Sequence, residues 1–366
     1  MVTGGAPSKE TVTNETSTTN PPDRLTVVVN RRIKPGGEAE FEKMNKNNLG
    51  NGMTSITVAA EECAAFGQRQ QVIESFPGRD TNLGNLKILR ALPIKGKRLV
   101  GPWCFLDRFG PYTFTEGKPM DVAPHPHIGL QTVTWLLAGE IVHHDSIGCE
   151  GLIRPGGVNV MTAGNGIAHA EETPSNSSRV LNGAQLWVAL PGAQRKISPS
   201  FQCIEKVPAV DLRGAVAQVF AGTLAGATSP AQHYSDIIGA DLAVHSGAEL
   251  TLPLNSSHEH ALLLLAGDAE IEGQTLDERN LYYLGTARSE IRFGSRTGSR
   301  LLLIGGPPFP EAILMWWNFD ARTPEEIAEA RTAWEERRWF GEVKAYQGPR
   351  LSAPPLVPLA HPNPAS

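Results

Sequence analysis

One stretch of the sequence, from Pro124 to Thr173, limits the possible folds more than any other. It reads PHPHIGLQTVTWLLAGEIVHHDSIGCEGLIRPGGVNVMTAGNGIAHAEET, a series of short apolar segments separated by turns rich in Gly and Asn. Such segments are typical of β-strands, in which side chains two residues apart point to the same face. His125 and His127 can therefore direct two imidazoles one way, and His169 and Glu171 can do the same from a later strand.

If these two strands are neighbours, three imidazoles and one carboxylate converge on a point. This donor set suits one borderline divalent metal such as Fe(II), Mn, Ni, Cu or Zn, and suits Ca or Mg less, because those ions prefer oxygen ligands. A single His-x-His pair is more often a surface or hydrogen-bonded pair than a ligand pair. A second pair that follows a glycine-bracketed turn, AGNG at 163–166, favours the metal site.

The residues around both pairs resemble the pirin family. The resemblance rests on the runs HPHIGLQTVTWLLAGEIVHHDSIG, RPGGVNVMTAGNGIAHAEE and LNGAQLWVALP, and it extends roughly from Val72 to Lys344. Pirins are two-domain proteins of the cupin superfamily, so the resemblance implies two tandem β-barrels (a bicupin). It also implies that the first barrel holds one metal, with Fe(II) expected, through His125, His127, His169 and Glu171.

The resemblance leaves two classes of function open. Bacterial pirins are associated with quercetin 2,3-dioxygenase activity, which implies a small, flavonol-like aromatic substrate and O2. In this reading Glu171 is the catalytic residue, because it accepts the substrate hydroxyl proton as well as binding the metal. Other pirins are described as redox-sensitive, metal-dependent regulators that act through protein partners. We favour the enzyme. The feature that separates the two classes is a cavity above the metal, because catalysis requires one wide enough for a bicyclic substrate.

The whole chain reads as an all-β protein. Its 366 residues are enough for two domains, and 37 Gly and 28 Pro indicate many turns. A second series of apolar segments and turns begins at Ala215, which suggests a duplicated barrel. We expect a disordered tail (1–23), an extension resembling a ferredoxin-like remnant (24–71), an N-terminal metal-binding cupin (72–205), a metal-free C-terminal cupin (206–320), a helix packed on a barrel (321–344) and a tail (345–366).

Charge and cysteine content exclude several classes of protein. The net charge of −5 gives no electrostatic basis for direct binding to nucleic acid. The four cysteines, at positions 63, 104, 149 and 203, form no CxxC motif and are too few for a disulfide scaffold. The sequence has no apolar run long enough for a membrane span and no apolar signal region at its start. A cytoplasmic location is therefore expected.

Several residues near the two His pairs have more than one reading. Gln131 stands where many cupins place a carboxylate ligand, and its amide could instead donate to a metal-bound oxygen. We expect His143, His144 and Asp145 to form a polar strand end near solvent. Alternatively, one of them fixes the tautomer of a ligand imidazole.

Aromatic residues near Trp103 read mainly as core, although Phe105 or Asp107 could line the pocket. We also expect an ion pair between Asp107 and Arg108. In the second half, His258-Glu259-His260 imitates a ligand pair, but no later His-x-Glu completes a site. We expect this segment to be a turn.

One helix is expected after the second barrel. Thr323, Pro324 and Glu326 have the arrangement of an N-cap, a first helical residue and a capping-box partner. The helix should end near Trp339, before Gly341. Its apolar face should be Ile327, Ala330, Ala333 and Trp334.

Overall fold

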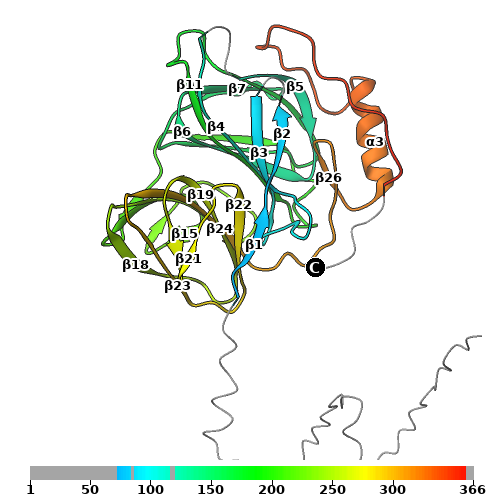
Figure 1. The fold of residues 1–366 in the computed structure, drawn as a ribbon. Coiled ribbons are helices and arrows are strands. Elements are labelled where there is room, and N and C mark those ends of the chain that lie inside the picture. The colour runs from blue at the N-terminus through cyan, green and yellow to red at the C-terminus, as the bar shows by residue number, and fades with distance from the viewer. Residues whose placement is uncertain (1–71, 84–85, 116–119, 360–366) are drawn as a thin grey trace, which may run out of the picture. The chain divides into compact units, whose positions relative to one another are not determined.

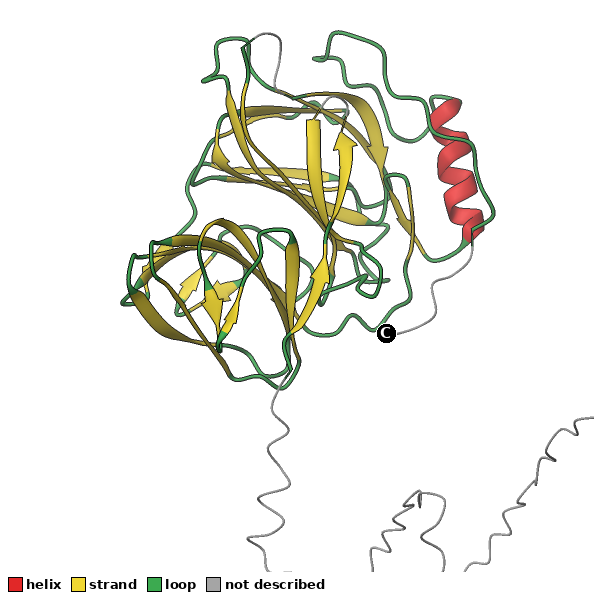
Figure 2. Cartoon of the chain, viewed as in Figure 1, coloured by secondary structure: helices red, strands yellow, loops and turns green. Residues whose placement is uncertain are grey.

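The computed structural model describes residues 72–83, 86–115 and 120–359. The predicted tail at 1–23 and extension at 24–71 lie outside these residues. The described part consists of two β-domains and one helix, α3 (Figures 1 and 2). This confirms the prediction of an all-β bicupin. No helix within the described residues has the length and apolar character needed to span a membrane.

The first barrel combines a seven-stranded and a four-stranded sheet. The larger sheet has the order β12 (Ser200–Ile204), β9 (Val158–Thr162), β6 (Leu130–Ala138), β11 (Val180–Ala189), β4 (Trp103–Thr113), β3 (Leu86–Leu92) and β2 (Arg79–Leu83). The smaller sheet has the order β5 (Asp121–His127), β10 (Ile167–Glu172), β7 (Ile141–Asp145) and β8 (Glu150–Ile153). Both His pairs of the sequence lie in the smaller sheet.

The second barrel repeats this arrangement. Its seven-stranded sheet has the order β1 (Glu74–Pro77), β22 (Asn280–Gly285), β19 (Glu259–Gly267), β24 (Ser299–Gly306), β17 (Ile238–Val244), β14 (Ala215–Ala221) and β13 (Ala209–Asp211). Its four-stranded sheet has the order β18 (Ala248–Pro253), β23 (Glu290–Ser295), β20 (Glu270–Ile271) and β21 (Gln274–Thr275). Two short pairs complete the strands, β15 (Thr223–Leu224) with β16 (Ala227–Thr228) and β25 (Leu314–Trp316) with β26 (Phe319–Ala321).

One hydrophobic cluster spans the two barrels and includes Leu106 of the first and Leu263 of the second. Two buried tryptophans of the first barrel reach into the second, where each indole N–H finds an acceptor. Trp103 Nε1 donates to the carbonyl oxygens of Ile238 and Gly305 over 3.2 and 3.0 Å. Trp135 Nε1 donates to Asp241 Oδ2 over 2.7 Å. Because each barrel satisfies polar groups of the other, their contact is part of the fold.

Strands at both ends of the described chain cross between the barrels. β1 precedes the first barrel in sequence but pairs with β22 of the second, beside which Figure 1 shows it. The β25–β26 hairpin follows the second barrel but returns to the first, where Phe319 bridges Ile128. The expected domain limits at 72 and 320 therefore do not separate the two barrels cleanly.

The helix α3 covers one side of the first barrel and spans Pro324–Glu335 (Figure 1). The side chain of Thr323 caps it by accepting from the backbone N–H of Glu326, as expected. Its buried residues are the four predicted ones, Ile327, Ala330, Ala333 and Trp334, which pack in one cluster with Ala168 and Ala170 of β10. The helix ends four residues before Trp339, because Arg337 and Trp339 adopt positive φ angles of 58° and 69°.

The segment expected to be a tail is packed as far as it is described. Leu351 N donates to the carbonyl oxygen of Pro124 over 2.9 Å, and Leu351 O accepts from Trp334 Nε1 over 2.8 Å. Ala353 is buried in the cluster beneath α3. The end of the described chain therefore contacts β5 just before the first His pair.

Candidate metal centre

Strand pairing brings the two His pairs together. β5 and β10 are antiparallel neighbours in which His169 lies opposite His125, and Ile167 lies opposite His127. The Nε2 atoms of His127 and His169 are 3.1 Å apart. Ligand atoms of His125, His127 and His169 all lie within 4.8 Å of one another, and all three side chains are buried. The convergence expected from the sequence occurs for these three imidazoles.

Glu171 lies beside this group without belonging to it. Its carboxylate lies within 4.8 Å of ligand atoms of His169 and of His143, forming a second group of three. A register irregularity in the β5–β10 pairing between His169 and Glu171 accounts for the change of direction. Glu171 nevertheless lines the same cavity as the three histidines. The four-ligand set therefore stays a prediction.

Backbone carbonyls fix the orientation of two of the imidazoles. His125 Nδ1 lies 2.9 Å from the carbonyl oxygen of Ala123, and His127 Nδ1 lies 3.0 Å from that of Asn318. A carbonyl oxygen only accepts, so each Nδ1 must carry the proton. Each Nε2 then keeps its lone pair, which is the form that binds a metal. Asn318 comes from the β25–β26 hairpin and has no motif that marks this role.

Burial keeps all three imidazoles neutral. Desolvation lowers the pKa of His125 to about 4 and holds the pKa values of His127 and His169 well below the ordinary value. Burial raises the pKa of Glu171 to about 7, against a smaller opposing effect of the hydrogen bond from Thr134. Three neutral, buried nitrogen donors beside one carboxylate fit a borderline divalent metal.

A cavity of about 400 Å³ opens above the histidines. Phe105 and Trp187 form one wall as a stacked pair with ring centroids 3.9 Å apart. Arg90 lies over Phe105, 4.4 Å from the ring centroid. The remaining lining includes Ile88, Phe109, Asp107, Val122, Gln185, Trp317 and Asn318. The cavity thus combines apolar and aromatic side chains with an equal number of polar ones.

Asp107 lines this cavity, but its ion-pair partner differs from the expected one. Both carboxylate oxygens accept from Arg90, each over 2.7 Å. The guanidinium of Arg108 instead points to the second barrel, where it donates to the carbonyl oxygen of Leu265 over 2.8 Å. The expected Asp107–Arg108 pair is wrong, because neighbouring residues of a strand face opposite sides of the sheet.

Gln131 faces away from the centre. Its amide donates to Thr162 Oγ1 over 2.9 Å and to the carbonyl oxygen of Gln232 over 3.1 Å. Its oxygen lies 3.0 Å from His233 Nδ1. Gln131 therefore joins the barrels and has no part in the proposed metal site.

The expected solvent-facing strand end at the close of β7 is buried. His143, His144 and Asp145 are only 3, 7 and 4% exposed. His143 Nδ1 lies 3.2 Å from His169 Nδ1, and its ring stacks on Phe201 at 4.0 Å. His144 instead contacts the carboxylates of Glu150 and Glu172 over 3.0 and 3.3 Å. The H-x-D spacing that places His143 and Asp145 on one face was the signal for this arrangement.

Both three-residue groups described above lie in the first barrel; the described part of the second barrel contains no such group. There, His258 precedes β19, and His260 lies within it, so the expected turn holds only for His258. The two rings are 5.9 Å apart, and His258 contacts Asp236 over 3.2 Å.

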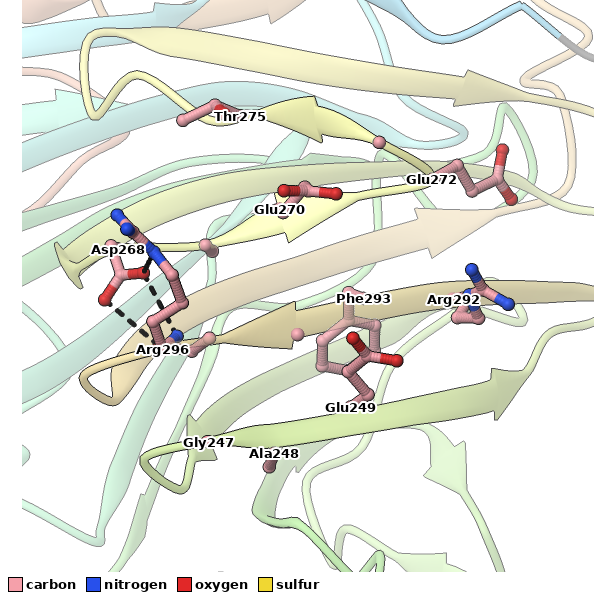
Figure 3. A pocket seen from close by; sticks show the side chains of 14 residues that line it. Gly247, Ala248, Glu249, Asp268, Glu270, Glu272, Thr275, Arg292, Phe293 and Arg296 are labelled. Carbon is pink, nitrogen blue, oxygen red and sulfur yellow. Dashed lines mark hydrogen bonds and ion pairs between the residues drawn. The ribbon is translucent and has the colours of Figure 1, made fainter.

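The second barrel also has a groove of about 500 Å³ on its four-stranded sheet, shown in Figure 3. Asp268 at one end accepts from the backbone N–H groups of Arg296 and Thr297 over 3.1 and 2.9 Å. The hydroxyl of Thr297 also donates to this carboxylate, and this bond, together with the backbone hydrogen bonds, lowers the pKa of Asp268 to about 2. This carboxylate therefore holds a turn, and the groove has no group of potential metal ligands.

Comparison with known proteins agrees with this architecture. The family model of pirin matches residues 85–188, and that of the pirin C-terminal cupin domain matches residues 239–340. A protein of Pseudomonas aeruginosa, provisionally named a quercetin 2,3-dioxygenase, is 46% identical over 75% of this chain and 87% of its own length. A pirin-like protein of Caulobacter vibrioides is 36% identical over 72% of this chain and 93% of its own.

A solved structure is also similar. The crystal structure of quercetin 2,3-dioxygenase from Acinetobacter baumannii superimposes with a TM-score of 0.76 and 43% sequence identity. The match covers 78% of this chain and 96% of that one. Two family models, these relatives and the bicupin fold agree, and the chain belongs to the pirin family.

Proposed function

We propose that this protein is a metal-dependent dioxygenase that opens the ring of a flavonol-like aromatic with O2. The observation that carries the proposal is the cavity of about 400 Å³ above three buried, neutral imidazoles. That volume lies within the usual range for sites that bind small molecules. The names of the similar proteins from Pseudomonas aeruginosa and Acinetobacter baumannii support the same reaction.

In this proposal, His125, His127 and His169 hold one divalent metal, and Glu171 completes the set. Fe(II) is the metal that we propose first, with Mn, Ni, Cu and Zn as alternatives. When bound, the metal would supply a Lewis-acidic centre through which electron density passes between substrate and O2. The carbonyl oxygens of Ala123 and Asn318 keep two of the imidazoles pointed at it.

The chain's own residues bind and orient the substrate. Phe105 and Trp187, which stack on each other, supply apolar aromatic surface to the cavity wall against which an aromatic bicycle can pack. Arg90, held by Asp107, lies over the ring of Phe105 and lines the cavity, where it can donate to a substrate oxygen. Trp187 also contacts His127 edge to face, with ring centroids 5.1 Å apart, so the wall adjoins the metal ligands.

Glu171 is the proposed proton acceptor. Its carboxylate is 7% exposed and lines the cavity, and it accepts from Thr134 Oγ1 over 3.3 Å. Thr134 also contacts Gln185 Oε1 over 3.0 Å, so its hydroxyl is shared between the two side chains. A carboxylate in an apolar environment accepts a phenolic proton more readily than an exposed one.

The test is turnover of quercetin with O2 after anaerobic loading of each metal in turn. Wild type should consume quercetin and release carbon monoxide. Glu171→Gln should lower turnover by about 10²- to 10⁴-fold, the usual contribution of a general base. The control is Glu172→Gln, whose side chain contacts His144 instead of the cavity. If the loaded protein consumes no quercetin with any metal, the regulatory function moves ahead of the enzyme.

A further inference from the structure

We propose that Asp145 and His143 form a hydrogen-bonded chain that sets the tautomer of His169 and so directs its Nε2 at the metal. His143 and Asp145 are thus positioning residues. The inference rests on the proposed metal site, but it does not depend on the reaction or on the substrate.

The chain begins at Asp145, whose carboxylate is fixed from two sides. Its Oδ1 accepts from the backbone N–H groups of Ile147 and Cys149 over 3.0 and 2.9 Å. Its Oδ2 lies 3.2 Å from His143 Nε2, and its side chain is fully buried. The carboxylate oxygens have different tasks: Oδ1 shapes the turn after β7, and Oδ2 faces the imidazole.

The direction of each hydrogen bond follows from this end. Since a carboxylate accepts, His143 Nε2 carries the proton, and the neutral ring keeps a lone pair on Nδ1. Nδ1 of His143 lies 3.2 Å from Nδ1 of His169. Because the His143 nitrogen accepts, His169 must donate from its Nδ1. The lone pair of His169 is then on Nε2, the atom 3.1 Å from Nε2 of His127. Asp145 thereby determines which nitrogen of His169 is available.

His169 differs in this respect from the other two histidines. Backbone carbonyls orient His125 and His127, and a backbone carbonyl cannot be changed by substitution. His169 depends on a side chain, which itself is held by stacking on Phe201 with planes only 4° apart. Among the three imidazoles, the orientation of His169 is therefore the one that a substitution of its hydrogen-bond partner can change.

The same atoms offer one competing explanation. The nitrogen separation of 3.2 Å between His143 and His169 also suits two ligands of one ion, and Glu171 lies close to both. His143 would then be a ligand of a second metal. The two explanations differ in the number of metal ions bound per chain and in the effect of Asp145→Asn on the tautomer of His169.

The decisive variant is Asp145→Asn, which is almost isosteric. The N–H groups of Ile147 and Cys149 require an acceptor, so the Asn oxygen takes the place of Oδ1 and its NH2 faces His143. His143 Nε2 must then accept, which puts the proton on Nδ1 and turns it toward His169. His169 is driven to the Nε2–H tautomer, and that tautomer cannot bind the metal through Nε2.

The probe is Zn(II), titrated against a chromophoric chelator. Asp145→Asn should weaken binding by about 10- to 100-fold, the usual effect of losing an outer partner. His143→Phe keeps the stacking on Phe201 but offers His169 no acceptor, so its zinc affinity should fall as far as that of Asp145→Asn. His143→Gln presents an amide oxygen to His169 and should restore most of the affinity. The matched control is His144→Gln, on the opposite face of β7, which should leave affinity unchanged.

The second readout is the tautomer itself, from nitrogen chemical shifts of histidine-labelled protein. In metal-free wild type, His169 should be protonated on Nδ1, and in Asp145→Asn on Nε2. Wild-type affinity together with an unchanged tautomer in Asp145→Asn would overturn the proposal. So would a second zinc per chain that disappears in His143→Phe. Failure of quercetin turnover with intact zinc binding would count against the proposed enzyme only.

Discussion

The two barrels have the same strand arrangement but opposite interiors. The first directs His125, His127 and His169 at its centre, with a cavity above them. The second is filled with apolar side chains, among which Leu262, Leu301 and Leu303 are completely buried. Since an apolar interior is sufficient to stabilise this fold, the buried histidines of the first barrel cost stability. The comparison places the candidate metal centre in the first barrel, while the interior of the second barrel is apolar.

The largest expected contrast is in metal content. His127→Ala removes a proposed ligand and should reduce metal affinity more than 100-fold, beyond the effect of an outer partner. His260→Ala, the matched change in the second barrel, should leave metal content unchanged. Metal analysis of both purified variants after loading makes the test. Loss of metal in His260→Ala, with His127→Ala unaffected, would reverse the roles of the barrels.

A cavity in the second barrel should affect stability but not the metal. Leu303→Ala removes a fully buried side chain and should lower the free energy of unfolding by about 2–5 kcal/mol. The folded fraction should still bind one metal per chain, because no ligand is altered. Urea unfolding combined with metal analysis checks both parts. A loss of metal from the folded fraction would show that the second barrel does more than support the first.

Acid should destabilise the metal-free protein through the buried histidines. The pKa of His125 is lowered from 6.5 to about 4, so below pH 6.5 the unfolded chain binds a proton that the folded chain does not. Its contribution to stability is complete above pH 6.5 and declines toward pH 4, by up to about 1.4 kcal/mol per pH unit. In the chelator-treated protein, His125→Gln should make the free energy of unfolding depend less steeply on pH. The decrease in slope should correspond to nearly one bound proton.

The opposing change at Glu171 does not affect this comparison, because both proteins retain that residue. Urea unfolding of wild type and His125→Gln between pH 4 and pH 7 gives the two slopes. Equal slopes would mean that His125 is protonated in the folded chain, and so is not held neutral by burial.

The smallest expected effect is at the cap of α3. Thr323 Oγ1 accepts from the backbone N–H of Glu326, and Thr323→Ala should cost about 1 kcal/mol. Metal affinity should not change, since the helix packs behind β10 and supplies no ligand. Thermal unfolding with and without metal would separate the two effects. An equal loss in metal affinity would make α3 part of the centre.

The sequence predicted the parts of the site that lie close together in the chain. The alternation of a strand is enough to place His125 with His127, and the glycine turn at 163–166 brings His169 back beside them. It could not reveal Asn318, whose contribution is a backbone carbonyl and whose position is 191 residues from His127. The bulge that redirects Glu171 was also hidden, because pairing irregularities depend on the neighbouring strand.

The error at His143 has a different cause. A run of three polar residues after an apolar strand is usually exposed, and the prediction followed this general tendency. The H-x-D spacing, which places His143 and Asp145 on one face of the strand, was given less weight. The fold was predictable for a simpler reason, since apolar segments and turns repeat along both halves. The sequence could not predict that β1 pairs with the second barrel or that the β25–β26 hairpin returns to the first, because long-range pairing leaves no local pattern.

The carbonyl of Asn318 has a consequence for how the protein is made. Domains of a growing chain generally fold in the order of their synthesis, N-terminal first. Here the orientation of His127 waits for the hairpin that follows the second barrel, because His127 gains its acceptor only after residue 318 has left the ribosome. The histidine cluster is thus finished late in synthesis, when the supporting barrel is already complete. Acquisition of the proposed metal would then follow the completion of both barrels.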